Sequence, residues 1–392
     1  MAESDFTKKG YSLIIDGKYY NTLDIESFSM MMKDPSYCYK FYWLEAIVQL
    51  ISEDIRETTF DAIIDEMICN AWYSVREFHI HISGMQLDGQ VRDGLERAVL
   101  LLTGLSDLPA NASKVEIKNA IAEHNSELKT YKEQLTNMVP YRALAGFFNK
   151  SSEAADWGSV RRMTAYIERI NRHTVLLPYI LGEESKLKKK VYFQDAWVEM
   201  IQDQMVSILG WIQYEKVKWL QNNNPEVPGL IYKLAPMDEK MRKLNNVRKL
   251  WEGILDVREI KDVFTGEPVV LKQYDVDHFI PWSFVMNDEL WNLMPMDSSL
   301  NSSKSNRLPK WSPFFIRFAK NQFIMYQLIH EKEGIRKLYE SCYRDNLHSL
   351  WAGQELYRKG NSEEEFINIL EKNMQPVYDS ARRQGYEVWN RG

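Results

Sequence analysis

The segment from residue 275 to residue 309, DVDHFIPWSFVMNDELWNLMPMDSSLNSSKSNRLP, constrains the fold more than any other part of the chain. Residues 269–276 are predicted to form a strand that leads into it. Residues 291–294 are expected to form a second short strand, and residues 297–306 a short helix that stops before Pro309. Two strands followed at once by a helix make a small ββα unit.

Polar residues stand at fixed places on these elements. The pair Asp277-His278 ends the first strand, and Asn292 lies on the second. Asn301 lies on the helix, with Lys304 one turn further along the same face. The ββα unit would therefore bring Asp277, His278 and Asn301 together.

This arrangement resembles the HNH superfamily, the His-Me finger nucleases, whose spacing of Asp-His, middle Asn, third Asn and Lys it matches without gaps. It is similar in particular to the HNH domain of the RNA-guided type II CRISPR nuclease. That domain likewise has Asp-His-x-x-Pro-x-Ser-Phe, then an Asn-x-x-Lys-Ser helix and a Pro. The resemblance covers only about 50 of the 392 residues of the chain. Other domains of the CRISPR enzyme have no visible counterpart, and nothing suggests a guide RNA.

The resemblance implies metal-dependent hydrolysis of phosphodiesters, which needs an attacking water, a base for its proton and positive charge beside the developing anion. His278 is the expected base, because an imidazole with an ordinary pKa of about 6.5 is mostly neutral at cellular pH. Asp277 and Asn301 offer hard oxygen ligands for one Mg²⁺ or Mn²⁺ ion, with waters and phosphate oxygens completing its shell.

Three further residues take their roles from the resemblance. Asn292 is expected to support catalysis by holding the loop after the histidine, without binding the metal. Lys304 and Arg307 are candidate contacts to the phosphates of the nucleic acid.

Many family members place two Cys-x-x-Cys pairs around this unit to bind a structural zinc. The chain has residues 263–266 and 296–300 at those locations, and neither stretch contains cysteine. We therefore expect no structural zinc, and rigidity from a small core instead. The residues expected in that core are Trp282, Phe284, Trp291 and Leu293.

Composition limits the remaining possibilities. The three cysteines, Cys38, Cys69 and Cys342, lie far apart, which argues against a disulfide framework. The first residues show neither a basic nor an apolar signal region, and no apolar run is long enough to span a bilayer. A cytoplasmic protein is expected.

The net charge of −6 means that any nucleic-acid surface must be local. The basic clusters that could supply one lie at 161–162, 186–190 and 240–249, although each can equally be a solvated helix face. The segment His79-Ile80-His81 suggests a metal site only if it is a strand. It lacks a third ligand at a sensible spacing, so a structural or surface role is expected.

The rest of the chain is predicted to be mainly α-helical, with the ββα module embedded in large helical domains. Apolar periodicity predicts helices at 37–51, 92–104, 114–136, 158–172, 193–221 and 238–255. Capping boxes are predicted at Thr58/Asp61 and at Ser362/Glu365. The turn cluster at 222–229 suggests a boundary or a long loop. We divide the chain into an N-terminal helical domain (1–150), a central helical region (151–255), the HNH module (256–312) and a C-terminal helical region (313–392).

The expected function is that of an HNH endonuclease acting on nucleic acid, with DNA as the expected substrate. Large helical domains beside a nuclease suggest a bacterial antiphage or restriction-type effector. Its partner could be a sensor or ATPase, or a second copy of the chain, and no membrane is expected. Two alternatives stay open. One is a stand-alone DNA-processing or mobile-element nuclease, and the other an inactive finger that only binds nucleic acid.

Overall fold

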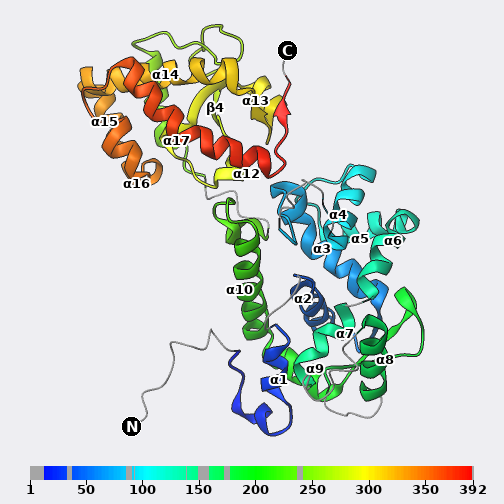
Figure 1. Cartoon of the computed structure of the whole chain (residues 1–392). Coiled ribbons are helices and arrows are strands. Elements are labelled where there is room, and N and C mark those ends of the chain that lie inside the picture. Colours follow the sequence, from blue (N-terminus) through cyan, green and yellow to red (C-terminus); the bar gives the residue numbers. More distant parts are fainter. Residues whose placement is uncertain are drawn as a thin grey trace, which may run out of the picture. The chain divides into compact units, whose positions relative to one another are not determined.

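The computed structural model describes residues 13–32, 38–84, 91, 93–137, 139–148, 159–171, 177–235 and 242–390 (Figure 1). These residues are mainly α-helical, as predicted, with a few short strands. The chain divides into two compact units, Met1–Pro225 and Glu226–Gly392, and the division falls within the turn cluster at 222–229. Among the described helices, none combines the length and apolar character needed to cross a membrane.

The first unit is a helical assembly with one small sheet. Its helices are α1 (Ile25–Met30), α2 (Tyr39–Ser52), α3 (Phe60–Phe78), α4 (Gly94–Leu105), α5 (Lys114–Glu123), α6 (Asn125–Thr136), α7 (Val139–Ala143), α8 (Val160–Asn171), α9 (Asp195–Asp203) and α10 (Met205–Asn223). Short 3-10 helices are η1 (Gly17–Asn21), η2 (Leu144–Phe147) and η3 (Lys186–Lys188). The strands are β1 (Glu57–Thr59), β2 (Tyr179–Leu181) and β3 (Lys190–Phe193).

Helix α2 is the centre of this unit, because it is buried almost all round, as its continuous apolar run predicts. Trp43 on α2 packs edge-on against Phe60 of α3 and donates from its indole N–H to the hydroxyl of Tyr179 on β2. Around it, β3 pairs antiparallel with both β1 and β2.

The structure corrects several predicted boundaries in the first unit. The cap of α3 is Thr59, whose hydroxyl accepts from the N–H of Ala62, whereas Thr58 lies in β1. The predicted helices 114–136 and 193–221 are each two helices, broken at His124 and Gln204. The sheet was not predicted, because strands of three or four residues carry too little alternation to be distinguished from helix ends.

The second unit has helices on both sides of a short hairpin. Its helices are α11 (Asn245–Leu255), α12 (Trp282–Val285), α13 (Ser298–Lys304), α14 (Trp311–Glu331), α15 (Glu333–Ser341), α16 (Tyr343–Asn346) and α17 (Glu363–Arg383). Short 3-10 helices are η4 (Leu230–Lys233) and η6 (Leu290–Asn292), and η7 (Ala352–Leu356) is a π-helix. The strands are β4 (Tyr274–His278), β5 (Leu293–Asp297), β6 (Leu308–Pro309) and β7 (Val388–Trp389).

One hydrophobic core extends through this unit, from Val247 on α11 to Trp389 on β7. It joins the hairpin to the C-terminal helices, so residues 256–312 and 313–392 share their buried side chains. Helix α14 carries Phe318, whose ring stacks on that of Phe279 with 4.7 Å between the centroids. Phe279 is the residue immediately after the expected catalytic histidine, His278. The predicted capping box of Ser362 and Glu365 is confirmed at the start of α17.

The hairpin pairs β4 with β5 antiparallel, with Asp277 opposite Met294 and His278 opposite Leu293. The predicted first strand began too early, because residues 270–273 form a turn and the strand begins at Tyr274. The predicted second strand also began too early. Asn292 lies in η6, just before β5. Helix α13 follows at once and is capped by the Asp297 carboxylate, which accepts from the N–H groups of Ser299 and Leu300.

Candidate active site

The strand β4 has one buried face and one polar face. Tyr274, Val276 and His278 are buried, whereas Asp275 and Asp277 alternate with them and are partly exposed. Both carboxylates therefore stand on the same side of the hairpin. Sequence reasoning assigned no role to Asp275. The signal that could have revealed it is its position two residues before Asp277 on a strand.

Helix α13 lays a polar face against these carboxylates. The side-chain N–H of Asn301 donates to Asp275 Oδ2 at 3.3 Å, and the ammonium of Lys304 donates to Asp277 Oδ2 at 2.8 Å. Residues one turn apart on the helix thus meet residues two apart on the strand. The expected ligands Asp277 and Asn301 consequently lie in one polar cluster.

The side chain of Lys304 is buried, whereas a contact to a phosphate of the substrate would need it to reach solvent. Its side chain is only 1% exposed, and its ammonium also donates to the carbonyl of His278 at 2.7 Å. The charge therefore ties α13 to the end of β4, which corrects the expectation that it faces the substrate. Arg307 follows α13, and its guanidinium donates to the carbonyls of Ser303 and Lys304 at the end of that helix.

Asn292 is completely buried and faces the backbone that follows the histidine. Its Oδ1 accepts from the N–H of Ile280, and its Nδ2 donates to the carbonyl of Ile280, both at 2.8 Å. The side chain of Asn292 thus holds the backbone of the loop after His278 by two hydrogen bonds.

His278 is also buried, with 2% of its side chain exposed. Its Nε2 lies 3.0 Å from Asp288 Oδ1 and 3.2 Å from the carbonyl oxygen of Asn287. Asp288 could not be identified from the sequence, because its contact with the histidine depends on the path of the loop between α12 and η6.

A carboxylate stands immediately before residues 263–266, the first stretch where the resemblance led us to look for cysteines. Asp262 Oδ1 accepts from the N–H groups of Phe264 and Thr265, and its Oδ2 accepts from the N–H of Asp297 at 3.1 Å. The turn is completed by Gly266, whose φ of +79° suits glycine. Asp262 thus joins this turn to the start of α13.

The expected small core is present in part. Phe284, Trp291 and Leu293 are buried members of the core of the second unit. Trp282 is only half-buried, and the guanidinium of Arg242 lies 4.8 Å from the centre of its ring.

The chemistry of the donors on β4 and α13 fits a hard divalent cation. Asp275, Asp277 and Asn301 present carboxylate and amide oxygens, which suit Mg²⁺ or Mn²⁺ better than a softer metal. Within the described ranges, no group of three or more His, Cys, Asp or Glu side chains is placed to hold a metal. Asn301 and water would have to complete such a shell.

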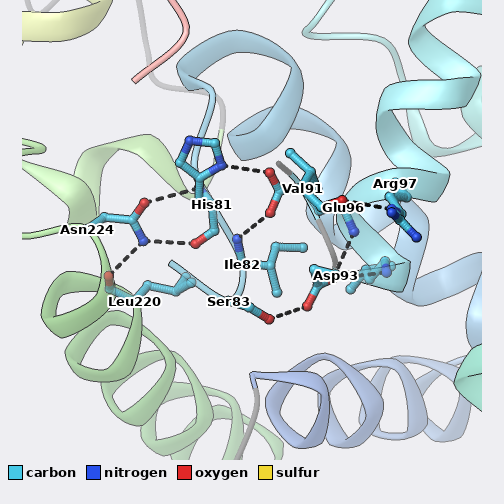
Figure 2. Close-up of polar contacts among 10 residues, drawn as sticks. His81, Ile82, Ser83, Val91, Asp93, Glu96, Arg97, Leu220 and Asn224 are labelled. Atoms are coloured by element: carbon cyan, nitrogen blue, oxygen red, sulfur yellow. Dashed lines mark hydrogen bonds and ion pairs between the residues drawn. The ribbon is translucent and has the colours of Figure 1, made fainter. Parts of the chain in front are cut away.

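The two histidines at 79 and 81 do not share a strand face. His79 follows α3 in the left-handed conformation, and burial lowers its pKa to about 4. His81 Nδ1 lies 2.7 Å from Glu96 Oε1, while Asn224 bonds both the N–H and the carbonyl of His81 (Figure 2). These contacts tie the segment after α3 to α4 and to the end of α10, in agreement with a structural role.

The basic cluster at 186–190 is largely engaged with acidic partners. Lys186 pairs with Glu133 at 2.7 Å, and Lys189 is buried and pairs with Glu168 at 2.9 Å. Lys240 of the third cluster lies outside the described residues.

A family model described as HNH endonuclease matches residues 262–310. All the residues that the sequence analysis assigned to the site lie within that match. No curated protein and no solved structure matches the chain. The likeness to the type II CRISPR nuclease therefore stays a resemblance of the motif. Residues 262–310 are similar to the HNH endonucleases, and this similarity supports a nuclease, with nucleic acid as its substrate and divalent metal ions as the general cofactor of the family.

Proposed function

We propose that the protein is a metal-dependent endonuclease that cuts DNA at the cluster formed by β4 and α13. The observation that carries the proposal is the contact of Asn301 and Lys304 with Asp275 and Asp277, one residue before a buried histidine. The oxygen donors, the candidate base His278 and the buried ammonium of Lys304 therefore lie together at the end of β4.

The chain's own residues divide the chemistry among them. His278 would accept a proton from water through Nδ1, because Nε2 is engaged with Asp288 and Asn287. The water oxygen then bonds to phosphorus, the bond from phosphorus to the leaving oxygen breaks, and that oxygen takes a proton from solvent.

Lys304 would hold Asp277 in place, since its ammonium bonds that carboxylate and the carbonyl of His278 together. Asp277 and Asn301 would hold the divalent metal ion, with Asp275 beside them. A bound divalent ion would supply positive charge to the phosphate and to the leaving oxygen.

The decisive experiment is incubation of supercoiled plasmid with the purified protein and Mg²⁺ or Mn²⁺. One site handles one strand, so the first product should be the nicked circle. His278→Ala should abolish cleavage, whereas His348→Ala should not, because the side chain of His348 is exposed. Cleavage that persists in His278→Ala at the wild-type rate would overturn the proposal. Direct linearisation by dilute, monomeric protein would overturn the single-site mechanism.

We further propose that the nuclease is the cytoplasmic effector of a bacterial antiphage or restriction-type system. The support is the presence of a separate helical unit, Met1–Pro225, to which the family match does not extend. Such a unit could dock a sensor, an ATPase or a second copy of the chain. Isolation of the tagged protein from infected and uninfected cells, followed by identification of bound proteins, tests this. Recovery of the chain alone and monomeric from both would contradict it.

A further inference from the structure

The imidazole of His278 has one nitrogen enclosed by atoms that only accept hydrogen bonds. Nε2 lies 3.0 Å from Asp288 Oδ1 and 3.2 Å from the carbonyl oxygen of Asn287. An ionised carboxylate and a carbonyl cannot donate, so Nε2 must carry the hydrogen. In the neutral ring the lone pair is then on Nδ1.

Asp288 is an ionised and fixed partner. Burial alone would raise its pKa, but the bond and charge of His278, the N–H of Lys243 and the charge of Arg242 hold the pKa below its ordinary value. Its Oδ2 accepts from the N–H of Lys243 at 2.8 Å, and its Oδ1 faces His278. With 5% of its side chain exposed, the carboxylate has little freedom to turn away.

The loop that carries Asp288 is held by segments far away in the sequence. Asn346 is completely buried, and its Nδ2 donates to the carbonyls of Asp288 at 2.8 Å and of Lys243 at 3.0 Å. The carboxylate of the next residue, Glu289, accepts from the N–H groups of His348 and Ser349. The position of Asp288 is therefore set by residues outside the 262–310 match.

We propose that Asp288 is the positioning residue of the general base, holding His278 with hydrogen on Nε2 and the lone pair on Nδ1. This inference rests on the proposed nuclease function and adds a residue to it. When Nδ1 accepts the proton from water, the ring becomes a cation, and the adjacent carboxylate stabilises it. Other charges lie nearby. The Lys304 ammonium is bound to the backbone carbonyl of His278 and to the Asp277 carboxylate, and the charge of Arg242 acts on Asp288.

The substitution Asp288→Asn isolates this role, because it keeps the shape and removes one acceptor. The asparagine side chain then has two possible orientations. Its amide oxygen accepts either from the N–H of Lys243 or from His278, and its N–H₂ group faces whichever of these two residues the oxygen does not. If it faces the ring, it favours the tautomer with hydrogen on Nδ1, which cannot accept the proton from water. Asp288→Ala serves as the second variant, and Asp256→Asn, at an exposed position on the same unit, is the matched control.

Two measurements on the full chain test the inference, and the first of them does not depend on the nuclease function. The first is ¹⁵N NMR of histidine-labelled protein at one pH where the imidazole is neutral, with His278 identified from the His278→Ala spectrum. Wild type and Asp256→Asn should show hydrogen on Nε2, and Asp288→Asn a mixture or the opposite tautomer. The second is plasmid cleavage by variants with wild-type melting temperatures. We expect kcat to fall on the order of a hundredfold or more, with KM for DNA and the Mg²⁺ requirement unchanged.

The outcomes are distinct. An unchanged tautomer in both Asp288 variants, or kcat within twofold of wild type, overturns the positioning role while the nuclease function stands. A wild-type protein that cleaves nothing overturns the proposed function, and the NMR result then decides alone whether Asp288 sets the tautomer.

Discussion

The carboxamide of Asn292 and the backbone of Ile280 form a closed pair of hydrogen bonds, each 2.8 Å long. A third bond joins the same two segments, because the N–H of Phe279 donates to the carbonyl of Asn292. The backbone immediately after His278 is thus tied at three points to one residue. The orientation of the histidine depends on this attachment, since the chain turns away from β4 here.

Replacing Asn292 with alanine should lower the melting temperature. Two backbone groups of Ile280 would lose buried partners, at a cost of about 1–3 kcal/mol. Residual cleavage should keep the wild-type dependence on Mg²⁺, because no ligand is removed. Asn368→Ala is the control, since Asn368 is exposed on α17. Thermal denaturation and Mg²⁺ titrations of both variants provide the measurement.

Replacing Asn301 with alanine should have the opposite profile. Asn301 is half-buried, and its one bond, to Asp275, is 3.3 Å long, so the melting temperature should change little. Loss of an amide oxygen from the cation's shell should raise the Mg²⁺ concentration needed for half-maximal cleavage on the order of ten- to a hundredfold. If Asn301→Ala only destabilised the protein and Asn292→Ala changed the metal requirement, the two roles would be reversed.

The candidate site could be predicted from local sequence because its elements are short and consecutive. Asp277 and His278 end a strand, and Asn301 and Lys304 share one face of the next helix, so their relation follows from strand and helix periodicity. The boundaries were less accurate. Val269 and Val270 resemble strand residues, but Val269 bonds back to Ile260, and Val270 begins an exposed turn that ends at Gln273.

The residues that the sequence did not reveal are those whose contacts are long-range. Asp288 reaches His278 only because Lys243 and Asn346 hold its loop. Neither contact follows a periodicity, and no spacing links residues 243, 288 and 346. The burial of Lys304 was missed for a related reason. A lysine on a short helix usually extends into solvent, and its ion pair with Asp277 depends on how closely α13 packs on β4.

The turn around Asp262 should be rigid without zinc, because one carboxylate joins it to α13. Asp262→Asn leaves an amide N–H₂ facing backbone N–H donors on one side or the other, and should destabilise the protein by about 1–3 kcal/mol. A strong zinc chelator should leave the wild-type melting temperature unchanged. Asp256→Asn is the control for the substitution. One tightly held equivalent of zinc, whose removal unfolds the protein, would contradict this account.

Lys233 should make stability depend on pH above neutrality. It is completely buried, its ammonium donates to the carbonyl of Phe284 at 2.6 Å, and burial lowers its pKa from 10.5 to about 7. Between those values the unfolded chain holds a proton that the folded chain has lost, so the free energy of unfolding rises with pH. The contribution is at most about 1.4 kcal/mol per pH unit.

The substitution Lys233→Met should remove that rise. Denaturant unfolding of wild type, Lys233→Met and the exposed control Lys320→Met at pH 7 and pH 9 measures it. The free energy of unfolding of Lys233→Met, relative to that of wild type, should be higher at pH 7 than at pH 9. Only at the lower pH does the wild type bury a substantial fraction of charged amine. Lys320→Met should show no such difference. If Lys233→Met changed the free energy of unfolding equally at both pH values, the amine would not titrate in this range. Lys233 would then keep one charge state while its amine bonds the carbonyl of Phe284, in the loop after His278.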